Sequence, residues 1–138
     1  MSRAVAIEVS HLGKTYEKVR AVDDLSFQVY AGEIFGLLGP NGAGKSTTLR
    51  ILITLLHPTS GSATILGMDS VKDADRVRKT IGYVPQERAI DRFLTGREHL
   101  ELLADLYHLS PEDASTRIPQ LLKLVELEEQ ADRPAKTY

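Results

Sequence analysis

Cysteine is absent from the 138 residues, so disulfide bonds and thiolate metal sites are excluded. This is compatible with a reducing cytosol. The four histidines do not have the spacing of a metal site. Apolar runs never approach the about 20 residues that span a bilayer, and no signal-peptide core follows the N-terminus. Any role at a membrane must therefore come through a partner.

A strong excess of either charge is also missing. The 17 basic and 19 acidic residues leave a formal charge of −2, and 42% of the residues are hydrophobic. This composition is typical of one ordinary globular domain and argues against a nucleic-acid partner, because no basic patch with interleaved aromatic residues is present. We expect Arg88, Arg92 and Arg97 to form a solvated charged face.

The most informative segment is residues 39–47, which read Gly-Pro-Asn-Gly-Ala-Gly-Lys-Ser-Thr. They follow the apolar run 34–38, which predicts a strand buried on both faces. Gly39, Gly42 and Gly44 allow the chain to turn sharply into a helix and to aim successive N–H groups at one point. This pattern predicts a phosphate-binding loop; the alternative is a glycine-rich turn with a solvated lysine.

The helix after this loop is predicted over 45–56, with Leu49, Leu52, Ile53 and Leu56 on its buried face. Its N-terminus favours bound anions. Lys45 can reach the β and γ phosphates of ATP, the Ser46 hydroxyl can coordinate Mg²⁺, and Thr47 lies toward the α phosphate. Asn41 and Ala43 complete the predicted phosphate-binding residues.

Periodicity and turn signals predict the other elements. Alternating apolar residues predict strands at 5–9 and 25–29, and shorter strands are expected at 63–66 and 81–85. A tight turn is predicted at 31–33 and a charged helix at 73–79.

Thr95 with Glu98 predicts a capping box that starts a helix with Leu100, Leu103, Ala104 and Tyr107 on one face. Ser110 and Pro111 start a further helix, with Ile118, Leu121, Leu122 and Val125 on one face and Pro119 predicted to kink or split it.

Four of these segments, namely Tyr16, 31–34, 39–47 and 82–86, occur in the order seen in ATP-binding cassette domains of transporters. The match extends over the whole chain. Residues 24–27, 94–98 and 132–138 resemble the ATPase subunits of daunorubicin-type drug exporters in particular. The resemblance implies an α/β fold with a P-loop NTPase core, an N-terminal antiparallel β subdomain and the start of a helical subdomain. Residues 1–86 would form the β subdomain and P-loop core, and 87–138 the connection and helical subdomain.

By position, Tyr16 resembles the aromatic residue that stacks on adenine, with Val22 packed beside it. The alternative for Tyr16 is a half-exposed loop tyrosine. Gln86 resembles the glutamine that contacts Mg²⁺ or the attacking water, the alternative being a polar residue that ends a strand. Residues 87–93 would then be the mobile connection to the helical subdomain, where the membrane partner docks.

The family implies a permease partner, a second ATP-binding subunit and a cytoplasmic position on the inner face of the membrane. No acidic strand of the family type follows Gln86, because Asp105 and the three residues before it fit a helical period better. We expect the chain to stop before the family's signature motif and to bind Mg-ATP without hydrolysing it. Two alternatives remain, a soluble cassette ATPase that acts on nucleic acid or ribosomes and a small phosphoryl-transfer kinase.

Overall fold

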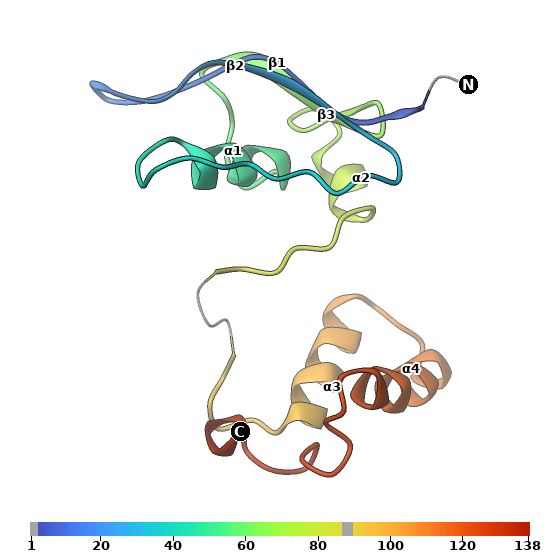
Figure 1. Cartoon of the computed structure of the whole chain (residues 1–138). Helices are drawn as coiled ribbons and strands as arrows, with labels where there is room; N and C mark the ends of the chain where they lie inside the picture. The colour runs from blue at the N-terminus through green and yellow to red at the C-terminus, as the bar shows by residue number, and fades with distance from the viewer. Residues whose placement is uncertain (1–2, 87–89) are drawn as a thin grey trace. The chain divides into compact units, whose positions relative to one another are not determined.

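The computed structural model describes residues 3–86 and 90–138. The chain divides into two compact units, Met1–Val84 and Pro85–Tyr138 (Figure 1). The first unit contains a sheet and two helices, and the second is helical.

The sheet of the first unit is antiparallel, with strand order β2-β1-β3-β4. Strands β1 (Val5–Tyr16) and β2 (Val19–Tyr30) form a long hairpin, so the two strands predicted from alternating apolar residues are confirmed. The predicted turn after β2 is also present, since the Glu33 N–H donates to the Tyr30 carbonyl. Strand β3 (Ser60–Ile65) begins before the predicted 63–66, and β4 (Met68–Asp69) was not predicted.

Helices α1 (Lys45–Leu52) and α2 (Ala74–Arg78) lie on the same side of this sheet (Figure 1). The helix predicted over 73–79 is therefore confirmed as α2. The core between helices and sheet is built from buried apolar residues of all these elements, namely Val9, Leu12, Val22, Ile51, Leu52, Ala63, Ile65 and Val77.

Helix α1 is shorter than predicted, and its predicted buried face is only partly right, because Leu52 is buried and Leu56, beyond the end of the helix, packs against the core. It ends at Leu52 because Thr54 takes a left-handed conformation, and the Leu55 N–H closes the end by donating to the Arg50 carbonyl. Ile51 is fully buried, whereas Leu49 is 46% exposed, so the prediction that Leu49 is core is wrong. The sheet covers only the face of α1 that carries Thr48, Ile51 and Leu52, and Leu49 lies off that face.

The strands predicted at 34–38 and 81–85 are not formed. Within residues 3–86 and 90–138, no backbone hydrogen bond joins either segment to a neighbouring strand. Ile34, Leu38 and Val84 are almost fully exposed. An apolar run becomes a strand only when another strand supplies hydrogen-bond partners, and the described residues supply none here.

The second unit contains α3 (Gly96–Leu106), α4 (Pro111–Leu124) and a short 3₁₀ turn η1 (Ala135–Thr137). Both predicted helix starts are confirmed, with the Thr95–Glu98 capping box at α3 and Ser110 capping α4. Pro119 lies inside α4 without splitting it. No helix of the described ranges 3–86 and 90–138 has the length and apolar character needed to cross a bilayer.

The buried faces of α3 and α4 are narrower than predicted. The core of the second unit consists of Ile118, Leu122 and Ala131, with Leu100 packed against it. Four residues assigned to the buried faces are instead substantially exposed, namely Leu103, Tyr107, Leu121 and Val125. Two helices and one loop cover only a narrow stripe of each helix, so the outer part of each predicted face stays in solvent.

Candidate phosphate-binding site

The loop 39–44 leads directly into α1, and Gly44 lies close to Ala21 and Val22 of β2. Gly44 is the N-cap of α1 and has φ of 84°. A Cβ at this position would collide with the Ala21 carbonyl oxygen and would lie 3.0 Å from Cγ2 of Val22. Gly44 therefore permits both the left-handed backbone and the close approach of the loop to β2.

The same turn leaves backbone donors at the start of α1. Gly44 has no side chain to cap the helix, and the first turn of α1 contains no acidic residue. The first N–H groups of a helix have no acceptor within the helix, and the helix dipole is positive there. Gly42 also has φ of 84°, in the left-handed region that favours glycine. The geometry is that of an anion-binding nest.

Lys45 adds a positive charge to the nest. Its Nζ donates to the carbonyl oxygens of Gly39 (2.6 Å) and Pro40 (2.7 Å), so the side chain folds back along the loop. An ammonium group has three donors, and these two bonds leave one for a further acceptor. The predicted contact of Lys45 with the β and γ phosphates stays a prediction.

The other predicted phosphate-binding residues are accessible. Asn41, Ala43 and Ser46 are exposed, and Thr47 is partly buried in the first turn of α1. The Ser46 hydroxyl is a hard oxygen donor in solvent beside the nest, which is the type of ligand that Mg²⁺ accepts. The residues present therefore fit a magnesium phosphate group.

Tyr16 and Val22 occupy different environments. Tyr16 ends β1, is 42% exposed and has the Lys14 Nζ 5.3 Å from its ring centroid. Val22 is only 6% exposed and packs in the core beneath Gly44. Part of the Tyr16 ring is thus in solvent, while Val22 lies against Gly44 and helps to hold the loop in place.

Gln86 lies in the second unit. Part of the connection predicted after it, residues 87–89, lies outside the described residues, and this part includes Arg88. The role of Gln86 toward a metal or water stays a prediction.

Arg97 lies at the surface, with 38% of its side chain exposed, and it also forms an ion pair. Its guanidinium donates to both carboxylate oxygens of Asp132. Asp132 lies 35 positions further along the chain, and no local signal in the sequence connects the two residues.

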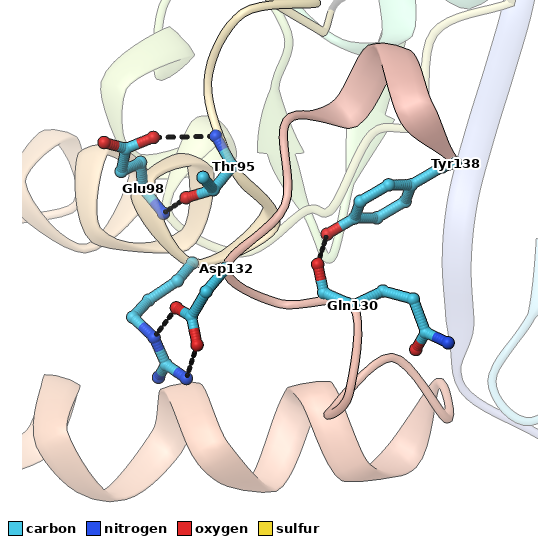
Figure 2. Close-up of polar contacts among 6 residues, drawn as sticks. Thr95, Glu98, Gln130, Asp132 and Tyr138 are labelled. Carbon is cyan, nitrogen blue, oxygen red and sulfur yellow. Dashed lines mark hydrogen bonds and ion pairs between the residues drawn. The ribbon is translucent and has the colours of Figure 1, made fainter.

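Among the residues that the structure describes, three carboxylates have a lowered pKa, and none belongs to the loop. The Arg97 hydrogen bond lowers the pKa of Asp132, and the Thr95 backbone N–H lowers the pKa of Glu98 in the capping box (Figure 2). The Lys72 and Val71 backbone amides lower the pKa of Asp69. In each case hydrogen bonds favour the charged form.

Comparison with known proteins agrees with this site. Residues 22–138 match the ABC transporter family. The chain therefore belongs to that family, and the fold predicted from the resemblance is confirmed.

Within the family, the chain groups with ATP-binding subunits of drug-resistance exporters. It is 44% identical over 133 residues to the daunorubicin/doxorubicin resistance ATP-binding protein DrrA of Streptomyces peucetius, covering 96% of this chain and 40% of that protein. It is 43% identical over 130 residues to the Nod factor export ATP-binding protein I of Sinorhizobium fredii, covering 94% and 38%. The chain thus spans about two fifths of the length of these relatives.

A solved ATP-binding subunit of an ABC transporter has the same fold. The two chains superpose with a TM-score of 0.80 at 33% identity, over 96% of this chain and 55% of the other.

Proposed function

We propose that this chain binds Mg-ATP through residues 39–47 and forms part of an exporter ATPase that drives efflux of drug-like or other small molecules. The observation that carries this proposal is the nest itself. Glycines at φ of 84° turn the loop into α1, and Lys45 Nζ lies along the loop. Backbone donors, a helix N-terminus and a lysine together suit a triphosphate.

The chain's own residues have distinct roles in this proposal. The backbone N–H groups after Gly44, at the start of α1, bind phosphate oxygens, and Lys45 donates its remaining hydrogen bond to them. Ser46 would hold Mg²⁺, which supplies charge neutralisation when bound. Thr47 orients the α phosphate, and Gln86 is proposed to approach the metal or water.

The adenine is proposed to stack on Tyr16. The ring is half exposed at the end of β1, and one of its faces lies near the Lys14 ammonium group. A base would use the other face or displace Lys14. Stacking contacts the face of the base, whereas adenine and guanine differ in the polar groups at their edges. Selectivity for ATP over GTP should therefore be modest.

The efflux role rests on the named relatives, which are exporter ATP-binding proteins. We propose a permease partner and a second ATP-binding subunit for the exporter ATPase, positioned at the inner face of the membrane. The charge of −2 does not favour the nucleic-acid alternative.

Calorimetric titration with ATP, with and without Mg²⁺, tests the site. Lys45→Ala should abolish most of the binding, because it removes the charge that faces the phosphates, while Lys79→Ala, a charge-matched change at the end of α2, should leave binding unchanged. Tyr16→Ala should weaken binding more than Tyr16→Phe. Equal affinity for wild type and Lys45→Ala would show that this loop is not the site.

We also propose that these 138 residues bind nucleotide without turnover. Lys45 is cationic and the hydroxyl of Ser46 is not basic near neutral pH, so neither can activate water. A phosphate-release assay should show no rate above the Lys45→Ala background.

A further inference from the structure

Lys14 contacts both the predicted adenine-stacking residue and the loop that follows α1. Its Nζ lies over the ring of Tyr16, 5.3 Å from the ring centroid, which is within the range of a cation–π contact. The same Nζ donates a hydrogen bond of 2.8 Å to the carbonyl oxygen of His57. This bond holds the ammonium group over the ring, so one face of Tyr16 already has an occupant.

The loop that supplies this carbonyl is itself attached to β1. The Thr59 N–H donates to the Gly13 carbonyl at 2.8 Å, and the Thr15 N–H donates to the Thr59 hydroxyl at 3.0 Å. Strand β3 begins directly after this loop and pairs with β1. The His57 carbonyl therefore has a defined position relative to the end of β1.

The backbone of Lys14 is also connected to the phosphate-binding loop. Lys14 pairs with Val22 of the neighbouring strand β2. Val22 is buried and lies against Gly44, the N-cap of α1. One strand pair thus links Lys14 to the turn at which the phosphates are proposed to bind, on the same unit that carries Tyr16.

We propose that Lys14 is a positioning residue for the nucleotide: it occupies one face of the Tyr16 ring and directs adenine to the other face. The inference rests on the proposed stacking of adenine on Tyr16. On the Lys14 side, a base would have to displace an ammonium group that has both a ring contact and a hydrogen bond. On the opposite side the base keeps both contacts, and a ring that is already restrained loses less freedom on binding.

The effect of Lys14 should be confined to the base of the nucleotide. Inorganic triphosphate carries a chain of phosphates like that of ATP but has no base to stack. Its affinity should therefore depend on Lys45 and not on Lys14, whereas the affinity for ATP should depend on both. Ionic strength near 0.15 M limits the general attraction between Lys14 and the phosphates, because the Debye length is then about 8 Å.

Calorimetric titration of the 138-residue chain with Mg-ATP and with magnesium triphosphate tests this role. Lys14→Met removes the charge and the donor but keeps an unbranched side chain, and it should weaken ATP binding about two- to fivefold without changing triphosphate binding. Lys14→Arg should restore ATP affinity, because a guanidinium group also stacks on aromatic rings and donates hydrogen bonds. Lys18→Met removes an exposed charge from the turn between β1 and β2 and should change neither affinity.

Proton NMR determines which face of Tyr16 the base takes. Protons above an aromatic ring resonate upfield, so the ε-methylene protons of Lys14 should be shifted upfield in the free chain and should stay so when ATP binds. If ATP abolishes this upfield shift, the base displaces Lys14 and the proposal is wrong.

The outcomes separate this role from the proposed function. If Tyr16→Ala weakens ATP binding but Lys14→Met does not, Lys14 does not position the base. The role is also overturned if Lys14→Met weakens ATP and triphosphate equally, or if ATP binds no more tightly than triphosphate. Failure of the proposed phosphate site would appear instead as a triphosphate affinity that is unchanged in Lys45→Ala.

Discussion

Replacing Gly44 by alanine should destabilise the first unit much more than replacing Gly42, although both glycines have φ of 84°. A residue with a Cβ in the left-handed region costs about 1–2 kcal/mol, and the lower entropy of the unfolded alanine chain offsets about 0.4–1 kcal/mol of this. Gly42→Ala should therefore lower the free energy of unfolding by about 0–1.6 kcal/mol. No atom lies within 4 Å of a Cβ at position 42.

At Gly44 a second term is added, because the new Cβ meets the Ala21 carbonyl oxygen and the Val22 side chain. The carbonyl belongs to a paired strand and cannot move without disturbing β1 and β2. Overpacking of this kind costs about 1–3 kcal/mol, so Gly44→Ala should lose about 1–4.6 kcal/mol of unfolding free energy in total.

The assay is NMR-detected amide exchange of β1 and α1 at increasing urea concentration, which reports the unfolding free energy of this unit alone. Gly32→Ala is the control, because Gly32 has φ of 79° and open space around it. If Gly44→Ala and Gly42→Ala lose the same stability, the close approach to β2 is not what requires glycine at position 44.

Two further predictions concern the first unit. Thr48 is 1% exposed, and its hydroxyl has no hydrogen-bond partner within the described residues. Thr48→Val should therefore raise the free energy of unfolding, measured by urea titration, by about 1 kcal/mol. A decrease would indicate a hydrogen bond to that hydroxyl. Asp69 has its pKa lowered below the ordinary 3.8 because the Lys72 and Val71 amides donate to it. The stabilising effect of ionised Asp69 is therefore complete above pH 3.8, and it is lost as the pH falls through the lower pKa of the folded state. Asp69→Asn should remove this part of the pH dependence of amide hydrogen exchange in α2. An unchanged pH profile in Asp69→Asn would show that another group is responsible.

Much of this protein could be predicted from short segments of its sequence, because the interactions involved are local. The loop 39–47 needs only glycines, a lysine and the start of a helix, all within nine residues. The Thr95–Glu98 capping box and the Ser110 cap depend on groups three residues apart, and both are formed as predicted. Strands β1 and β2, which carry the alternating residues, pair with each other because a tight turn joins them.

Tertiary structure decided the features that need a distant partner. The apolar run 34–38 has the composition of a strand, yet it is not one because no described strand pairs with it. Helical periodicity predicted that Leu49 is buried, but the sheet packs against the face of α1 that carries Ile51 and leaves Leu49 in solvent. Arg97 and Asp132 meet only because Ala131 is anchored in a core that α4 completes. A local pattern determines which conformation a segment prefers, but hydrogen-bond partners and buried surface from elsewhere in the chain determine whether and how that preference is used.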